Sequence, residues 1–345
     1  MRYFRGSIIV TFAGLALGAF VGWEASGTAA GTLSTLFIVC VLAVLEVSLS
    51  FDNAVVNATV LRQMDAVWRR RFITWGIAIA VFGMRIVFPL VIVAVVADIS
   101  PWAALVMAAT DPDAYSRTLT SAHVSVAAFG GAFLAMVGLS HFFDKEKDVH
   151  WIGMVEAPLA RLGRIEAVEI GVVLALLWAI SGWLHEGERL TFVTAGIAGL
   201  LTYIAVDGVS ALLGEPEAGA EVTRSGAASF LYLEVLDASF SFDGVIGAFA
   251  LSNNLFVIAI GLGIGAMFVR SLTIMLVDEG TLAEYRYLEH GAFWAIIALG
   301  TIMFLQTVTH VPEVVTGLVG AGFIGLSWVS SLRYNRRRAE RAAQR

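Results

Sequence analysis

The chain contains the stretch Glu46-Val-Ser-Leu-Ser-Phe-Asp-Asn-Ala-Val55, which returns almost unchanged as Asp237-Ala-Ser-Phe-Ser-Phe-Asp-Gly-Val-Ile246. Each copy has a carboxylate, then serines two and four residues later, then Phe-Asp. Each copy also lies inside a long apolar run of the kind that crosses a membrane. A charge in hydrocarbon is costly, so acids are rare in such runs, and their repetition marks a functional site.

The composition is that of a polytopic membrane protein. The 345 residues are 58% hydrophobic and 14% charged, and the mean hydropathy is +0.82, whereas a soluble domain carries roughly 25% charged residues. The single cysteine, Cys40, excludes a disulfide framework and a multi-thiolate metal site. The sequence has no Walker motif, nucleophile elbow, kinase signature or zinc-protease pattern, so we expect no enzyme. Nothing in it indicates nucleic-acid binding.

Apolar windows of about 17–25 residues predict an all-α bundle of ten membrane spans. Arg2 and Arg5 place the N-terminus inside, and alternation through the spans then brings the arginines of 69–71 and 333–345 to the same side, as the positive-inside rule requires. We therefore expect a multi-pass protein of the cytoplasmic (inner) membrane with both termini in the cytoplasm. The predicted spans are 7–22, 33–61, 72–97, 122–143, 168–184, 190–213, 227–251, 255–277, 291–311 and 314–332.

The predicted organisation has five parts. In the long cytoplasmic loop that begins at 144, an interfacial amphipathic helix and a plain solvated loop remain equally compatible with the sequence. The parts are an N-terminal span and loop at 1–32, a first repeat unit at 33–143, the cytoplasmic loop with two connecting spans at 144–226, a second repeat unit at 227–332, and a basic cytoplasmic tail at 333–345.

The two repeat units are predicted to have opposite topology. Their motifs lie five spans apart, so the motif helices run in opposite directions across the bilayer. Downstream, Gly76 and Arg85 align with Gly261 and Arg270, nine residues apart in each copy. Inverted repeats with a polar break near the middle of the membrane are typical of secondary transporters.

The predicted spans hold more acids than bases. If all were ionised, the excess over Arg85 and Arg270 would be four negative charges, which requires protonation, bound cations or a wet cavity. The six acids are Glu46, Asp52, Asp207, Glu234, Asp237 and Asp243.

Helical phasing places only some of these side chains together. Asp52 and Asp243 lie about 120° around the helix from the motif acid that precedes them. For all of them to reach one site, both helices must break, and we expect the breaks near Asn53 and Gly244, where freed carbonyls become additional ligands. The residues that share a face are Glu46, Ser50, Asn53 and Asn57 in the first motif helix and Glu234, Asp237, Ser241 and Gly244 in the second.

Carboxylates, hydroxyls, an amide and carbonyls form an all-oxygen set suited to a hard divalent cation such as Mg²⁺, Mn²⁺ or Ca²⁺. Arg85 and Arg270 are either structural counter-ions or internal cations that compete with the substrate. Alternatively, these polar groups only hydrogen-bond one helix to another. The candidate metal ligands are Glu46, Ser50, Asp52, Asn53, Glu234, Asp237, Ser241 and Asp243, with Asp207 as an additional candidate.

At these residues the chain resembles the TerC family of integral membrane proteins, which is named for tellurium resistance and grouped with the LysE-like exporters. The resemblance covers roughly 33–90 and 227–310 and rests on the two acidic motifs and the downstream arginines. It implies efflux of manganese or a related divalent metal, with Glu46, Asp52, Asp237 and Asp243 as ligands. The chain departs from the pattern by having Gly244 where Asn53 stands in the first repeat, and by its additional acids and spans.

The leading hypothesis is a divalent cation exporter that works by alternating access, and proton antiport is compatible with its buried acids. The alternative is a non-transporting membrane partner that hands metal to secreted or stress-response proteins, or scaffolds them. An intramembrane aspartyl hydrolase is disfavoured because the sequence lacks a Gly-x-Gly-Asp signature. The sequence indicates a lipid bilayer, a metal ion and protons as partners, and it does not specify any protein partner.

Overall fold

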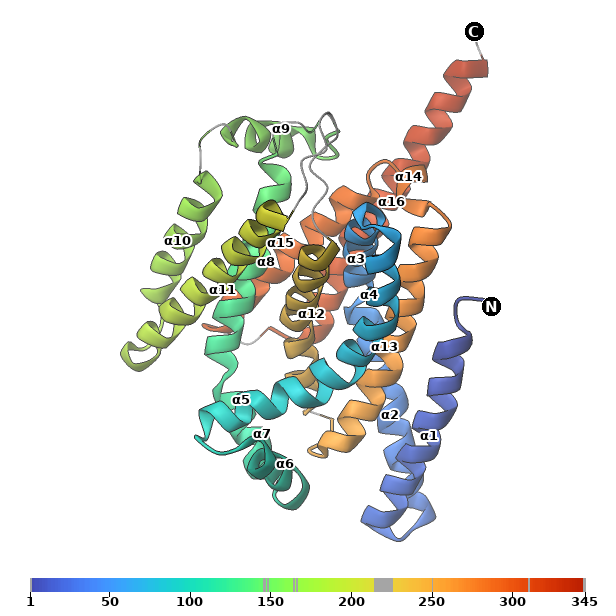
Figure 1. The fold of residues 1–345 in the computed structure, drawn as a ribbon, viewed down its shortest axis with the longest axis vertical. Coiled ribbons are helices and arrows are strands. Elements are labelled where there is room, and N and C mark those ends of the chain that lie inside the picture. The colour runs from blue at the N-terminus through green and yellow to red at the C-terminus, as the bar shows by residue number, and fades with distance from the viewer. Residues whose placement is uncertain are drawn as a thin grey trace.

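A computed structural model describes residues 2–144, 147, 149–163, 165, 167–213, 226–249, 251–309 and 311–343, and these residues form helices without a strand (Figure 1). Seven of the described helices are long and apolar enough to cross a membrane, or eight if the bent pair Phe82–Val96 and Pro101–Thr110 is one span. The all-helical membrane fold is therefore confirmed, while the count of ten spans stays a prediction.

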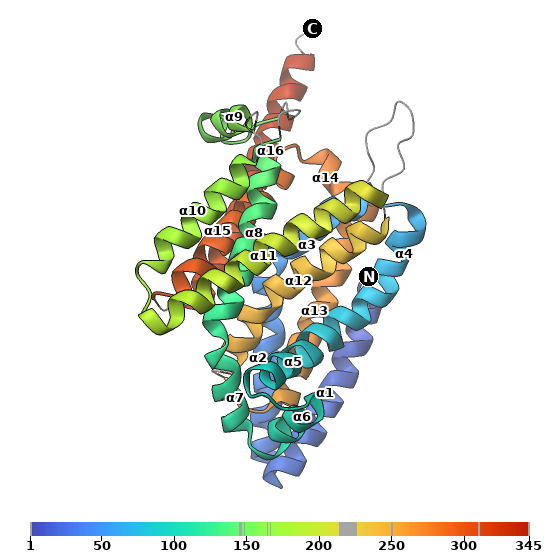
Figure 2. The same cartoon turned by 60° about the vertical axis from the view of Figure 1, so that its left-hand side comes forward.

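The helices run up and down between two ends of the molecule, which we name the α9 end and the α6 end (Figures 1 and 2). In chain order they are α1 Arg5–Ser26, α2 Ala29–Leu49, α3 Phe51–Gln63, α4 Ala66–Ala78, the π-helix η1 Ile79–Val87, α5 Phe88–Val96, α6 Pro101–Thr110, α7 Pro112–Ser121, α8 His123–Phe142, α9 Gly153–Leu162, α10 Val168–Ser181, α11 Glu186–Leu213, α12 Gly226–Ala248, α13 Leu255–Asp278, α14 Thr281–Glu284, α15 Leu288–Gln306 and α16 Glu313–Ala343.

The outer helices turn large apolar side chains away from the bundle. Phe12 of α1 is 71% exposed and Leu318 of α16 is 67% exposed. An apolar surface of this kind needs a covering, and for helices of this length the covering is the lipid chains of a bilayer.

The first motif helix is broken and the second is not. Ser50, with φ −103° and ψ 17°, separates α2 from α3, so the first break lies three residues before Asn53. The predicted break at Gly244 is wrong, because α12 continues through it to Ala248. Glycine therefore permits a break without causing one.

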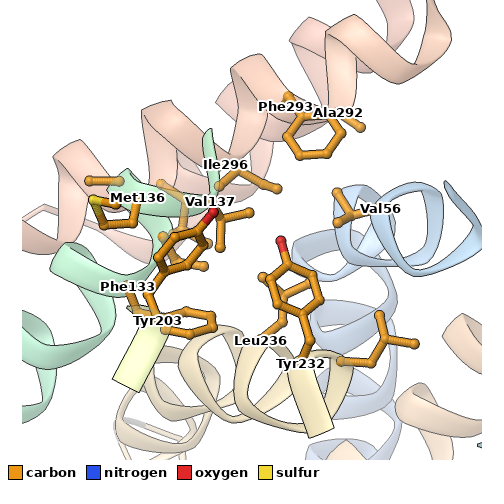
Figure 3. Close-up of a cluster of buried hydrophobic side chains, with 14 of the residues drawn as sticks. Val56, Phe133, Met136, Val137, Tyr203, Tyr232, Leu236, Ala292, Phe293 and Ile296 are labelled. Carbon is orange, nitrogen blue, oxygen red and sulfur yellow. The ribbon is translucent and has the colours of Figure 1, made fainter. Parts of the chain in front are cut away.

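The main hydrophobic core joins α3, α8, α11, α12 and α15. Figure 3 shows Val56 of α3, Tyr232 and Leu236 of α12 and Ile296 of α15 within it. At the other side of α12, small residues allow α13 to press against α2: a Cβ atom at Gly265 would lie 2.5 Å from Cβ of Glu46. Close helix contact at glycine is expected in a membrane bundle.

The loop after α8 contains a helix, α9, that crosses the end of the bundle (Figure 2). Its Glu156 is 1% exposed and accepts hydrogen bonds from the backbone N–H of Trp151 at 2.8 Å and the indole N–H of Trp294 at 2.9 Å. The Nδ1 atom of His290 lies 2.9 Å from the same carboxylate. One buried carboxylate thus fastens α9 to α15.

This anchor makes the attachment of α9 sensitive to acid. Burial raises the pKa of Glu156, but hydrogen bonds from His290, Trp294 and the backbone of Ile152 outweigh it and lower the pKa from 4.5 to about 2. A lowered pKa in the folded state means that the stabilisation is present above about pH 4.5 and is lost as the pH falls toward 2. We expect hydrogen exchange of residues 151–162, corrected for intrinsic rates, to accelerate over this range.

The matched control is Glu156→Gln, which should show fast exchange of the same residues already at neutral pH and no further acid step. A variant that keeps the slow exchange of the wild type at pH 7 would show that the carboxylate is not the anchor.

Candidate functional site

Arg85 joins the two motifs. Its Nη2 atom binds Oε1 of Glu46 on α2, and its Nη1 atom lies 3.9 Å from Oδ2 of Asp237 on α12. Glu46 is 2% exposed, Arg85 3% and Asp237 9%. The three charges are therefore held inside the bundle, where an unpaired charge costs several kcal/mol.

Neutral side chains of the first motif complete this arrangement. The side-chain amide of Asn53 donates a hydrogen bond of 2.7 Å to Oδ1 of Asp237, and the hydroxyl of Ser50 donates one of 3.1 Å to Oε1 of Glu46. The predicted convergence of Glu46, Ser50, Asn53 and Asp237 is thus present in the structure, although the two motifs are 184 residues apart in the sequence at the Asn53–Asp237 contact.

These side chains border a small polar cavity of about 20 Å³, which accommodates about one water-sized guest. Two amide oxygens, Oδ1 of Asn53 and Oδ1 of Asn57, have no hydrogen-bond partner among the described residues. Buried oxygens without a partner are unusual and call for a ligand or a water. The cavity is lined by Glu46, Ser50, Asn53, Asn57, Arg85, Asp237, Ala266, Val269, Arg270 and Thr273.

The second arginine, Arg270, lies at the edge of this cavity. Its guanidinium carbon is 3.8 Å from the ring centroid of Phe72, a favourable cation–π position. A Cβ atom at Gly76 would lie 2.4 Å from Nη2 of Arg270 and 3.0 Å from Oε1 of Glu234. The glycine of the first repeat therefore makes room for the arginine and the additional acid of the second.

Asp52 lies outside this cluster. It is 5% exposed, its Oδ1 atom accepts a hydrogen bond of 2.9 Å from the backbone of Asn53, and its Oδ2 atom would lie 2.9 Å from a Cβ atom at Gly320 of α16. Because α3 is regular after Ser50, Asp52 stays on a different face from Asn53 and points toward α16.

The remaining candidates are also placed apart from the cavity. Ser241 is buried, and its hydroxyl has no hydrogen-bond partner among the described residues. Asp207 is exposed on α11 and borders a larger cavity at the α9 end. Asp243 belongs to α12 by its backbone, while its side chain lies outside the described part of the structure.

Two polar residues that line the cavity, Asn57 and Thr273, are not among the predicted ligands. Asn57 shares the helical face of Glu46 and Asn53, so the sequence pattern carried a signal for it. Thr273 lies three residues after Arg270, but no motif surrounds it. Its position becomes apparent only when α13 is packed against α3.

The cavity offers few strong metal ligands. Across the described residues, no group of three or more His, Cys, Asp or Glu side chains is placed to hold a metal ion. The site has two carboxylates, Glu46 and Asp237, and its other ligands for a cation would be amide and hydroxyl oxygens. Such a set matches a hard oxygen-binding cation and fits neither zinc nor copper.

The central ion pairing predicts a large effect of Arg85→Leu. The change leaves Glu46 and Asp237 without their shared cation, so we expect the free energy of unfolding in detergent to fall by about 3–5 kcal/mol. Adding Glu46→Gln should recover much of the loss, because it removes one uncompensated charge.

The matched control is Arg70→Ala, an exposed arginine of α4, which should change stability by no more than about 0.5 kcal/mol. Equal stability of Arg85→Leu and the wild type would contradict the pairing.

Comparison with known proteins places the chain in a family. The sequence profile of DUF475, described as a protein of unknown function, matches residues 51–338. No curated protein and no solved structure matches the chain. The matched range includes α3, both arginines and α12, and Glu46 lies just before it. Because the match covers well over half of the 345 residues, the chain belongs to the DUF475 family.

Proposed function

We propose that this protein transports a hard divalent cation across the membrane and binds it in the cavity between Glu46 and Asp237. The observation that carries the proposal is the donor set of that cavity. Two buried carboxylates face one small volume together with two amide oxygens for which the described part of the chain supplies no hydrogen-bond partner. Oxygen ligands of mixed charge are those that Mg²⁺, Mn²⁺ and Ca²⁺ prefer. The resemblance to the TerC family makes Mn²⁺ the first candidate and efflux the first candidate direction.

The charges around the cavity supply a mechanism for binding and release. Arg85 occupies the position of a cation between Glu46 and Asp237. An incoming divalent ion competes with it for the same oxygens, so binding requires the guanidinium to withdraw. When the ion leaves, Arg85 returns and the empty carboxylates are compensated again. This exchange avoids leaving bare charges inside the membrane, which is the main cost of a transport cycle.

Proton exchange extends the same scheme. Glu46, Glu234 and Asp237 bring three potential negative charges close to two arginines. With all three acids ionised the set has one excess negative charge, and one bound proton makes it neutral. A divalent ion that displaces this proton leaves one excess positive charge, whereas an ion that binds while the proton is retained leaves two. Metal antiport against protons is the form of transport that this balance favours.

The proposed topology is ten spans with an inverted repeat, and the α9 end in the cytoplasm. In support, α2–α3 and α12 run in opposite directions (Figures 1 and 2). Each motif helix also packs against the arginine-bearing helix of the other unit: α2 and α3 contact α13, and α12 contacts η1 and α4. Helix α16 carries the basic tail out of the bundle at the α9 end, as expected for the inner face of a cytoplasmic membrane (Figure 1).

Mn²⁺ flux into proteoliposomes, followed with an enclosed fluorescent indicator, tests the proposal. Asp237→Asn keeps the shape of the side chain and removes its charge, so we expect Mn²⁺ affinity to fall by at least tenfold, equivalent to about 1.4 kcal/mol. Glu46→Gln should behave in the same way.

The control is Asp52→Asn, because Asp52 is an equally buried acid of the same motif that faces away from the cavity. It should bind Mn²⁺ with affinity close to that of the wild type. Metal binding without flux in the wild type would favour the scaffold function, and full flux in Asp237→Asn would reject the site.

A further inference from the structure

A second, much larger cavity lies at the α9 end. Its volume is about 880 Å³, and its lining is mainly polar. Four acids and three lysines or arginines border it, so with neutral histidines it carries a slight negative charge that favours cations. These residues are Asp144, Glu169, Asp207 and Glu289, and Arg62, Lys147 and Arg286.

Helix α3 borders both this cavity and the small polar site. Asn53 and Asn57, near its start, line the small site, whereas Thr59, Val60 and Arg62, near its end, line the large cavity. Val56, which lies between Asn53 and Asn57 on α3, belongs to the apolar cluster with Tyr232 and Ile296 (Figure 3). The lining residues of the two spaces are thus successive segments of one helix.

The hairpin of α3 and α4 is built as a stiff unit. Asp65 at its tip accepts hydrogen bonds from the backbone N–H of Val67 and Trp68, at 2.9 and 3.0 Å. The guanidinium of Arg69 donates to the carbonyls of Leu61 and Met64, at 3.1 and 3.2 Å. The first set caps the start of α4 and the second closes the end of α3, so the turn resists bending.

At the base of this hairpin, each of its two helices adjoins an irregular segment. One is the break at Ser50, and the other is the nine-residue π-helix η1, Ile79–Val87. Segments of π-helix inside α-helices are frequently found at functional sites. Both segments carry residues of the small site, Ser50 on one and Arg85 on the other. Rotation of the hairpin about its base would therefore change the site directly.

The tip of the hairpin combines buried side chains with one weak polar contact. Leu61 and Met64 are 2% and 3% exposed and belong to the main hydrophobic core. Nη2 of Arg62 lies 3.6 Å from Oε2 of Glu289 at the start of α15, and the two side chains are 43% and 29% exposed. A half-exposed ion pair of this kind adds little stability and breaks readily. His141 of α8 faces the same glutamate, with Nδ1 4.0 Å from Oε1.

We propose that the cavity at the α9 end is the chamber from which a hydrated divalent cation reaches the small site, and that the α3–α4 hairpin is the wall that opens between them. The Arg62–Glu289 pair, which we name the latch, is the exposed polar contact that adds to the buried core contacts in holding the wall closed. This inference rests on the proposed function for the identity of the ion, while the movement of the hairpin rests only on the fold.

Cysteine accessibility tests the movement. In a Cys40→Ser background, Thr273→Cys places a thiol of nearly unchanged size in the small site. A cationic, membrane-impermeant methanethiosulfonate reagent should modify it slowly from the α9 side. Adding Arg62→Ala should increase the rate several-fold, because it releases the latch, whereas the matched control Arg70→Ala should leave it unchanged. Asp207→Cys, on the wall of the chamber, should react rapidly in every background.

Three results would overturn the inference: no effect of Arg62→Ala, an equal effect of Arg70→Ala, or modification only from the opposite side, where a cavity of about 530 Å³ lies beside His123 and Glu188. Protection of the thiol at position 273 by Mn²⁺ is a separate readout of the ion. Loss of that protection with the latch effect intact would reject the proposed function and leave the moving hairpin in place.

Discussion

The structure depends on the placement of one guanidinium between two buried carboxylates from opposite halves of the chain. Arg85 binds Glu46 and faces Asp237 at 3.9 Å. Inside a bundle of membrane helices, a carboxylate without a counter-ion is costly. Other features serve this contact: Gly265 lets α13 approach α2 beside Glu46, and the amide of Asn53 holds Asp237 in position.

The proposed cation site combines compensated charges with oxygen atoms that are available to a ligand. Arg85 satisfies the acids by charge, but two amide oxygens at the same cavity keep no partner among the described residues. In the function that we propose, a divalent ion would bind the carboxylate and the amide oxygens at once. The interruptions in regular helix at Ser50 and in η1 lie at this cavity, so the backbone can yield where the charges change. In the movement that we propose, the tip of the α3–α4 hairpin stays rigid and its base, at Ser50 and η1, bends.

Much of this arrangement could be predicted from the sequence because helical periodicity is local. The shared face of Glu46, Ser50 and Asn53 follows from their spacing, and the pairing of the two motifs follows from their similarity. The orientation of Asp52 could not be predicted, since it depends on where the helix breaks. A break at Ser50 leaves Asp52 facing α16, whereas the sequence pattern favours a break at Asn53.

Contacts between segments that are far apart in the sequence could not be predicted either. In the sequence, Glu156 is one of several charged residues in a polar loop. In the structure it is 1% exposed and accepts a hydrogen bond from Trp294 of α15. Thr273 and Gly76 acquire their roles only from neighbours on other helices. In a membrane bundle, small and polar residues take their meaning from packing, which a single sequence does not specify.

We propose that one cation binds between the two motifs, and an anomalous-scattering map of crystals soaked in Mn²⁺ would locate it. We expect a peak within coordinating distance of both Glu46 and Asp237, with the guanidinium of Arg85 displaced from Glu46. A peak elsewhere in the protein, or full retention of the Arg85–Glu46 contact with no peak beside it, would show that no cation binds between the motifs.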